Sequence, residues 1–343
     1  FSGDSNGFFK RSLIEACVTT QPISTQSGDI QFRASVHGSP NKKYVFGIDP
    51  ASEQDNFAIT VLELEPDHRR IVYCWTINRK KMRERLKGKT NEASDKSFYN
   101  YCAKKIRDLT KVFPTDHIGI DKQGGGIAII EALHDISELG PNDQKMWPYV
   151  LQGKHDPFWW EVENKPTDAE QGLHNLHVVQ FANSQFNEEC YHSLKKDLEM
   201  RTILFPMFDS VELGLSLEQD NLAGRDYDTL EDCVLEIEEL KNELTTIVHT
   251  QTITGRDKWD TPEIKEPGGR KGRLRKDRVS SLLIANQIAR LIDVRIGQVT
   301  YIPVGGYIGQ KPKAKTGQLY YGPDHIISKM TGVYGTSVQR NKQ

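Results

Sequence analysis

Apolar and β-branched residues dominate several short runs in the first quarter of the chain, and polar breaks separate these runs. The runs at 44–50 and 57–64 flank a short polar loop, and together they predict two strands joined by a turn. A third run, at 69–78, predicts a third strand. The first run closes with Asp49 and Pro50. Because proline has no N–H to donate to a sheet, we expect pairing to stop there, with Asp49 at the open end of the strand.

From residue 98 onward, helical patterns alternate with strand patterns. Residues 98–113 carry apolar side chains at helical spacing, which predicts an amphipathic helix that ends before a proline. The apolar run 117–121 predicts a strand that ends on Asp121, and the glycines at 124–126 allow a tight turn into a helix over 127–136. Further along we expect a strand at 177–181, a helix from Asn183 or Ser184 to Met200, a strand at 203–205, a helix at 229–244, a strand at 245–254 and a helix from Asp277 to Leu291.

The other stretches divide the chain into regions. Residues 1–38 begin with a possible helix at 8–16, become rich in Ser, Thr, Gln and Gly, and are interpreted as a peripheral segment or linker. Residues 39–295 then form one domain with an irregular insertion at 138–174, and a basic tail rich in Gly, Tyr and Lys occupies 296–343. Exposed loops are expected at 79–96 and at 262–276.

Composition narrows the classes of protein to consider. The chain has 343 residues, 45 basic and 47 acidic, so any surface that binds nucleic acid must be a local patch. The five cysteines form no C-x-x-C pair, which favours reduced intracellular thiols and no zinc site. There is no signal peptide and no apolar run of membrane-spanning length. Because the chain begins at Phe1, we interpret it as a fragment of a longer protein.

Three carboxylates fall at positions that the predicted topology would bring together. Three antiparallel strands followed by alternating helices and strands give the layout of the ribonuclease-H-like fold, an α/β fold with a mixed sheet flanked by helices. In that layout the ends of the first and fourth strands lie side by side, which joins Asp49 to Asp121, and a late helix adds Asp277. Carboxylates that face one point repel one another unless cations lie between them, and such hard oxygen ligands suit Mg²⁺ or Mn²⁺.

These motifs resemble the nuclease domain of the large terminase subunit of tailed bacteriophages over roughly residues 40–295. The matching stretches are Gly47-Ile48-Asp49-Pro50-Ala51 with Asp55 after it, Gly119-Ile120-Asp121 with its glycine-rich turn, and Lys276-Asp277-Arg278 at the start of a helix. Segment 181–206 resembles the family's strand, helix and strand that ends in proline.

The resemblance implies a DNA endonuclease that cuts double-stranded DNA, with little sequence preference, during viral genome packaging in the host cell cytoplasm. It also implies two Mg²⁺ or Mn²⁺ ions on Asp49, Asp121 and Asp277, with Asp55 as an auxiliary ligand, and a portal protein and a small terminase subunit as partners. Two ions about 4 Å apart can activate a water molecule and stabilise the leaving oxygen of a phosphodiester. The family's ATPase motif G-x-x-x-x-G-K-[ST] is absent, so residues 1–38 would be a remnant or linker of a missing ATPase domain.

A basic loop adjoins the third carboxylate in the sequence. Because it lies next to the proposed phosphodiester site, we expect it to contact the DNA backbone instead of forming only a solvated face, and the basic tail is a second candidate for contact with DNA or a portal protein. The predicted DNA-binding residues are Arg270, Lys271, Arg273, Arg275, Lys276 and Arg278, with Lys122 beside Asp121 as an addition.

Several simpler interpretations stay open. Asp277 is also suited to cap a helix, Asp121 and Asp55 suit turns, and the aromatic residues 158–160 suit either packing or base stacking. A transposase or Holliday-junction resolvase of the same fold would also use a carboxylate triad, but no separate end-binding domain is visible. An actin-like or sugar-kinase ATPase needs an Asp-x-Gly hairpin, whereas Pro-Ala follows Asp49, and its second half-domain is missing.

Overall fold

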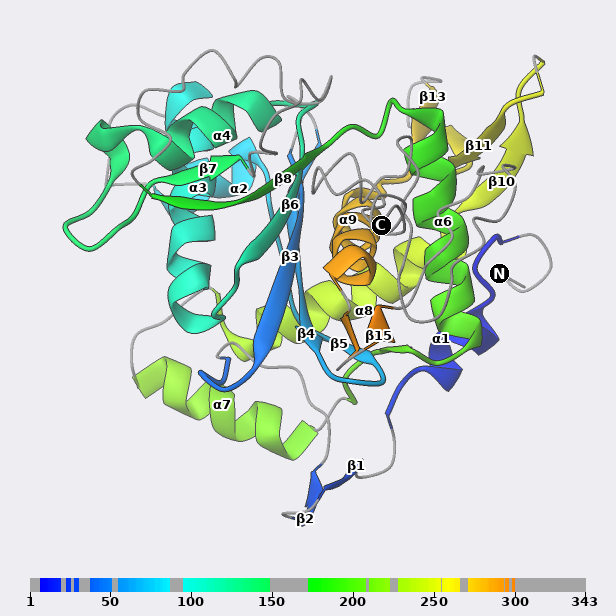
Figure 1. Ribbon diagram of the computed structural model, residues 1–343, viewed down its shortest axis with the longest axis horizontal. Helices are drawn as coiled ribbons and strands as arrows, with labels where there is room; N and C mark the ends of the chain where they lie inside the picture. Colours follow the sequence, from blue (N-terminus) through cyan, green and yellow to red (C-terminus); the bar gives the residue numbers. More distant parts are fainter. Residues whose placement is uncertain are drawn as a thin grey trace, which may run out of the picture.

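In a computed structural model of the protein, a seven-stranded mixed sheet runs through the middle of the molecule, with helices on both faces (Figure 1). The strand order across the sheet is β7-β8-β6-β3-β4-β5-β9. The structure describes residues 7–19, 23–25, 28–30, 38–50, 55–86, 95–148, 172–207, 210–222, 228–253, 255–265, 271–292, 294–295 and 298–299.

The centre of the sheet is built from the three apolar runs at the start of the domain. They form β3 (Lys43–Asp49), β4 (Phe57–Leu64) and β5 (Arg69–Ile77), and successive strands pair antiparallel. Nearly every side chain of these strands is buried, because helices cover both faces of the sheet. This burial explains why the sequence shows continuous apolar runs here instead of an alternating pattern.

The second half of the sheet is parallel. β6 (His117–Asp121) pairs parallel with β3, and β8 (Leu173–Val179) pairs parallel with β6. The short strands β7 (Met146–Pro148) and β9 (Ile203–Leu204) extend the edges, parallel to β8 and β5. The order β5-β4-β3-β6-β8, with three antiparallel strands followed by parallel ones, is that of the ribonuclease-H-like fold, so the predicted fold class is confirmed.

Helices cover the two faces of the sheet unequally (Figure 1). One face carries α3 (Asp95–Val112) and α4 (Gly126–His134), and the other carries α6 (Ser184–Glu199), α8 (Leu230–Thr246) and α9 (Asp277–Ile292). α9 lies against β3, β4 and β6 and is also in contact with α6 and α8. Every side chain from Ser281 to Ala289 is buried, which makes α9 the central helix of the fold.

The N-terminal segment joins the same core. It contains α1 (Arg11–Ala16), the short helix that its sequence suggests, and the Sγ of Cys17 donates a hydrogen bond to the carbonyl oxygen of Leu198, 3.2 Å away at the end of α6. The buried side chains of the segment are Phe9, Ile14 and Cys17. The apolar residues of this part pack against α6 and the sheet edge, while the assignment of residues 1–38 as a peripheral segment or linker stays a prediction.

The expected exposed loop at 79–96 is wrong at its start. Residues Arg79–Arg85 form α2, which Asn78 caps by accepting a hydrogen bond from the backbone N–H of Lys81 at 2.8 Å. Met82 is buried beneath this otherwise charged helix. A strong cap and one apolar contact are sufficient to hold a helix that carries no clear amphipathic pattern.

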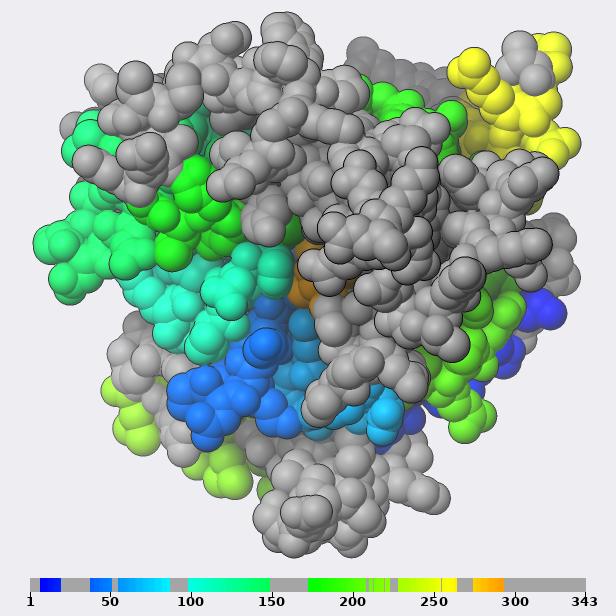
Figure 2. Space-filling model, in the orientation of Figure 1, coloured from blue at the N-terminus to red at the C-terminus, as the bar shows by residue number. Residues whose placement is uncertain are grey.

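Two hairpins lie between α8 and α9: the expected strand at 245–254 is present as the shorter β10 (Val248–Gln251), and the expected loop at 262–276 contains a second hairpin. The first pairs β10 with β11 (Asp257–Asp260) and protrudes at the edge of the molecule (Figures 1 and 2, yellow). The second pairs β12 (Glu263–Lys265) with β13 (Lys271–Arg273), inside the predicted loop. The remaining elements are α7 (Ser210–Leu222), the 3₁₀ helix η1 (Ile136–Glu138), β1 (Ile23–Thr25) with β2 (Gly28–Ile30), and β14 (Val294–Arg295) with β15 (Gln298–Val299).

Several sequence expectations fall outside the described residues. These are the aromatic residues 158–160 within the insertion and all of the tail from residue 300. Within the described ranges, no helix is long and apolar enough to cross a membrane. All five cysteines are buried and carry free thiols.

Candidate functional site

Two neighbouring parallel strands end on aspartates at the same edge of the sheet. The pairing of Ile48 with Ile120 puts Asp49 and Asp121, the next residue on each strand, at matching positions. Burial raises the pKa of Asp49 well above its usual range, and the charges of Asp277 and Asp121 raise it further. Asp49 therefore lies within electrostatic reach of both Asp121 and Asp277, although the three residues are 72 and 156 positions apart along the chain.

Two glycines bring α9 close to the sheet next to these carboxylates. A Cβ atom on Gly47 would lie 2.0 Å from the carbonyl oxygen of Ser281, and one on Gly119 would lie 2.4 Å from Cγ2 of Ile284. Because alternate residues of a strand face the same side, each aspartate two positions later points to the face that α9 covers. The glycines thus allow the helix to approach and align its first turn with the strand ends.

The glycine-rich turn after Asp121 is a backbone requirement. Gly124 and Gly125 have positive φ angles of 62° and 105°, and Gly125 is the N-cap of α4. A Cβ on Gly126 would lie 1.9 Å from the carbonyl oxygen of Asp121. Burial raises the pKa of Asp121 to about 6, against hydrogen bonds from backbone N–H groups that include the one from Gln123 to Oδ1 at 3.2 Å. The turn therefore shapes the surroundings of this carboxylate.

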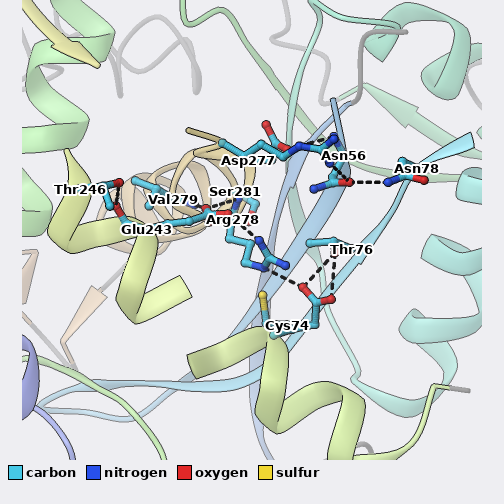
Figure 3. A network of polar contacts seen from close by, with 12 residues as sticks. Asn56, Cys74, Thr76, Asn78, Glu243, Thr246, Asp277, Arg278, Val279 and Ser281 are labelled. Atoms are coloured by element: carbon cyan, nitrogen blue, oxygen red, sulfur yellow. Dashed lines mark hydrogen bonds and ion pairs between the residues drawn. The ribbon is translucent and has the colours of Figure 1, made fainter. Parts of the chain in front are cut away.

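Asp277 is the first residue of α9, and its carboxylate accepts a hydrogen bond from Asn56, the residue just before β4 (Figure 3). Its Oδ2 accepts the backbone N–H of Asn56 at 2.9 Å. The Oδ1 of Asn56 in turn accepts from Nδ2 of Asn78 at 3.0 Å and from Nη1 of Arg275 at 2.5 Å. Burial raises the pKa of Asp277, and the charge of Asp55 adds to the rise, so Asp55 lies near this carboxylate as well.

Glu243 of α8, and not Asp277, meets the first amides of α9. Its Oε2 accepts the backbone N–H groups of Arg278 and Val279 at 3.1 and 3.3 Å. The simpler interpretation of Asp277 as a helix cap is therefore not supported by its contacts. Burial raises the pKa of Glu243 to about 7, the charge of Asp277 contributes to the rise, and Arg278 opposes it.

The predicted DNA-binding residues have different surroundings. Arg275 is exposed, whereas the Nζ of Lys276 donates to the carbonyl oxygen of Trp259 at 3.1 Å and lies 3.4 Å from Oδ1 of Asp260. Arg278 is mostly buried between Glu236 and Glu243, which does not favour contact with DNA. Arg270 and the side chains of Lys271 and Arg273 lie outside the described residues, and Lys122 is half-buried. These DNA-binding assignments stay predictions.

Sequence reasoning missed the residues that hold Asp277 in place. Glu236 and Glu243 lie on α8, where charged positions of an amphipathic helix are normally solvated. Asn56 and Asn78 had a weak local signal, since Asn56 directly precedes one predicted strand and Asn78 is the last residue of another. Their roles depend on the contact of Asn56 with Asp277, which lies 221 residues later.

The donor chemistry of the three aspartates fits a hard divalent cation. Carboxylate oxygens are the ligands that Mg²⁺ and Mn²⁺ prefer, and a cation would relieve the like-charge repulsion that raises the pKa of Asp49. In the part of the chain that the structure describes, however, no group of three or more His, Cys, Asp or Glu side chains is arranged to hold a metal ion. Asp49 is therefore influenced by the charges of the other two aspartates, but the three side chains are not arranged as a complete set of metal ligands.

Comparison with solved structures finds phage terminases. The large terminase nuclease from thermophilic phage G20c matches at 16% identity and a TM-score of 0.44, over 82% of this chain and 98% of that one. The same nuclease with bound magnesium matches at 14% identity and a TM-score of 0.44, over 82% and 97%. The HK97 bacteriophage large terminase matches at 12% identity and a TM-score of 0.40, over 82% of this chain and 43% of that one. No family model and no curated protein matches the chain.

Proposed function

We propose that this protein is a divalent-metal-dependent endonuclease that hydrolyses double-stranded DNA, in the manner of a terminase nuclease domain during viral genome packaging. The observation that carries the proposal is the meeting of Asp49, Asp121 and Asp277 in one electrostatic field at the edge of a ribonuclease-H-like sheet. Buried carboxylates whose pKa is raised by burial and by neighbouring like charges are candidates for a functional site. In that role the partners would be DNA, a portal protein and a small terminase subunit, in the host cytoplasm.

Asp49, Asp121 and Asp277 would hold Mg²⁺ or Mn²⁺, with Asp55 as an auxiliary ligand. When bound, two such ions would supply an activated water molecule and charge stabilisation for the leaving oxygen. The chain itself orients the ligands: the backbone N–H of Asn56 fixes one oxygen of Asp277, and the turn at Gln123 fixes one oxygen of Asp121. The burial of Asp121 and Asp277 keeps water away from these carboxylates and strengthens their interaction with a cation.

Contact with the DNA backbone would come from the basic residues before α9. Arg275 is exposed, and its guanidinium is anchored on Asn56, the same residue that holds Asp277. A phosphate bound there would lie next to the carboxylates. Such contacts read no base sequence, which agrees with cutting that has little sequence preference.

The test is nicking of supercoiled plasmid by the isolated chain. We expect nicking with Mg²⁺ or Mn²⁺, none in EDTA, and no stimulation by ATP. Arg275→Ala should weaken binding equally for unrelated DNA sequences and lower the log–log salt slope by about 0.9. Cutting that persists in EDTA, or nucleotide hydrolysis in place of cutting, would refute the proposal and favour an ATPase.

A further inference from the structure

We propose that Arg278 is a positioning residue for Asp277: Glu236 and Glu243 of α8 hold its guanidinium and thereby fix the first turn of α9. The inference rests on the proposed function, because it assumes that the orientation of Asp277 matters for metal binding and cutting. It replaces the prediction that Arg278 contacts a DNA phosphate.

The guanidinium of Arg278 is committed to two carboxylates. Its Nε donates to Oε2 of Glu236 at 2.7 Å, and its Nη1 donates to Oε1 of Glu243 at 2.5 Å (Figure 3). The side chains of Arg278, Glu236 and Glu243 are only 12%, 15% and 9% exposed. An arginine that binds a phosphate presents its donor fork to solvent, whereas this fork faces the interior.

The same carboxylates tie α9 to two other elements. Glu243 accepts the backbone N–H groups of Arg278 and Val279, which have no partner within α9 because they belong to its first turn. Glu236 also accepts a hydrogen bond from Oγ1 of Thr76 on β5, at 2.9 Å to Oε2. The start of α9 is therefore held to α8, and through Glu236 and Thr76 to β5 of the sheet. We call this set of contacts the clamp.

This clamp sets the direction of Asp277. Consecutive residues on a helix point about 100° apart, so a first turn that directs Arg278 towards α8 directs Asp277 towards another side. On that side the backbone N–H of Asn56 holds its Oδ2, and Asp49 lies within electrostatic reach. If the clamp is released, the first turn can rotate or fray and the carboxylate loses its fixed direction.

The experiment compares Arg278→Lys and Arg278→Ala with the parent and with Arg275→Ala. Three quantities are measured: the rate of plasmid nicking, the salt slope of DNA binding, and the Mn²⁺ concentration that gives half of the maximal thermal stabilisation. A lysine keeps the charge that a phosphate contact needs but cannot bridge two carboxylates as a fork. We therefore expect both Arg278 variants to nick at least tenfold more slowly, with a parental salt slope and at least a threefold higher half-saturating Mn²⁺ concentration. Arg275→Ala should instead lower the slope.

A salt slope that falls by about 0.9 in Arg278→Ala, with parental binding in Arg278→Lys, would overturn the inference and restore the phosphate contact. Parental nicking and parental Mn²⁺ affinity in both variants would also overturn it. If Arg278→Ala fails to fold, Glu236→Gln keeps an acceptor for Nε and Thr76, and the same three measurements decide. A parent that does not nick DNA would refute the proposed function, whereas the Mn²⁺ titration would still report on the clamp.

Discussion

The two ends of α9 both carry buried charge, but the charges are arranged in opposite ways. In the second half of the helix, Nδ2 of Asn286 and Nη1 of Arg290 bind the carboxylate of Asp197 on α6 at 2.7 and 2.5 Å. Arg69 and Thr202 complete the surroundings of that carboxylate, at 3.5 and 2.9 Å. At the first turn, by contrast, Asp277 lies near Asp49 and Asp55, and burial, followed by the like charges, raises the pKa values of Asp49 and Asp277.

These two arrangements separate buried charges that stabilise the fold from buried charges that are available for function. One carboxylate surrounded by cations and neutral donors is compensated within the chain, and breaking such a set leaves uncompensated charge. The three aspartates near the first turn are compensated only in part by the chain's own cations, and a bound cation would add to that compensation.

Asp49→Asn should almost abolish cutting and leave folding intact. The amide keeps the shape but is a poor ligand for a hard cation, so the nicking rate should fall by about 10³-fold or more. Because one like charge is removed, the melting temperature without metal should equal or exceed that of the parent, and Mn²⁺ should raise it less. Plasmid nicking and thermal melts with and without Mn²⁺ measure both effects.

The exposed Asp116, at the opposite end of β6, supplies the control Asp116→Asn, which should cut and melt like the parent. A marked loss of melting temperature in metal-free Asp49→Asn would mean that Asp49 is a structural turn residue. Normal melting with normal cutting would remove the whole triad.

Asp197→Asn should give the opposite result. The substitution leaves the guanidinium groups of Arg69 and Arg290 buried without their carboxylate, and breaking a buried pair costs about 3–5 kcal/mol. The free energy of unfolding from urea titration should fall by that amount. The nicking rate per folded molecule should remain parental, and a specific loss of cutting in well-folded protein would contradict the division of α9 into two halves.

Gly47→Ala should affect both stability and cutting, because the added methyl group would collide with the backbone of α9 at Ser281. Overpacking of this kind costs about 1–3 kcal/mol, and the displaced helix should also slow cutting. Gly214 is the matched control, since nothing lies within 4 Å of the corresponding Cβ and Gly214 is within α7. Gly214→Ala should stabilise the protein by about 0.5–1 kcal/mol. Urea titrations of the two variants measure the change in the free energy of unfolding. Equal changes for Gly47→Ala and Gly214→Ala would refute the close approach of α9 to Gly47.

The histidine pair beside α9 should give a smaller, pH-dependent effect. The Nδ1 of His117 lies 2.8 Å from Nε2 of His177, and burial and then the charge of His117 lower the pKa of His177 to about 3. The unfolded state binds a proton at a pKa of about 6.5, so stability is full above that pH and is lost as the pH falls towards 3. The slope is at most about 1.4 kcal/mol per pH unit for each histidine.

His177→Asn should remove this contribution. The difference in unfolding free energy between parent and variant should therefore change with pH between about 6.5 and 3 and be constant above 7. Because Gly119, the sheet neighbour of His177, faces Ile284 and Ile288, the pair lies at the structural half of α9. A pH-independent difference would show that His177 has an ordinary pKa.

The sequence alone predicted the central strands and placed Asp49 and Asp121 at the ends of two of them, because both features depend on local patterns. Each central strand is a continuous apolar run, and Asp49 and Asp121 are marked by the proline or glycines that follow them. Glu243 could not be predicted, because its partners lie 35 and 36 residues later and a charged position on an amphipathic helix is normally solvated. The burial of Cys17 depends on a contact with Leu198, 181 residues away.

Gly47 and Gly119, which allow the close approach of α9, also define a sequence pattern that can be searched for. Both strands end in the same tripeptide, Gly47-Ile48-Asp49 and Gly119-Ile120-Asp121, because the helix needs the missing side chain two positions before each aspartate. At the contact with Gly47, α9 carries the small residues Ser281 and Ala285. In this chain, the complementarity of an absent and a small side chain is what lets β3 and α9 approach each other. A search that scores the two tripeptides jointly with the small residues after a late helical aspartate would therefore weigh shape as well as residue identity.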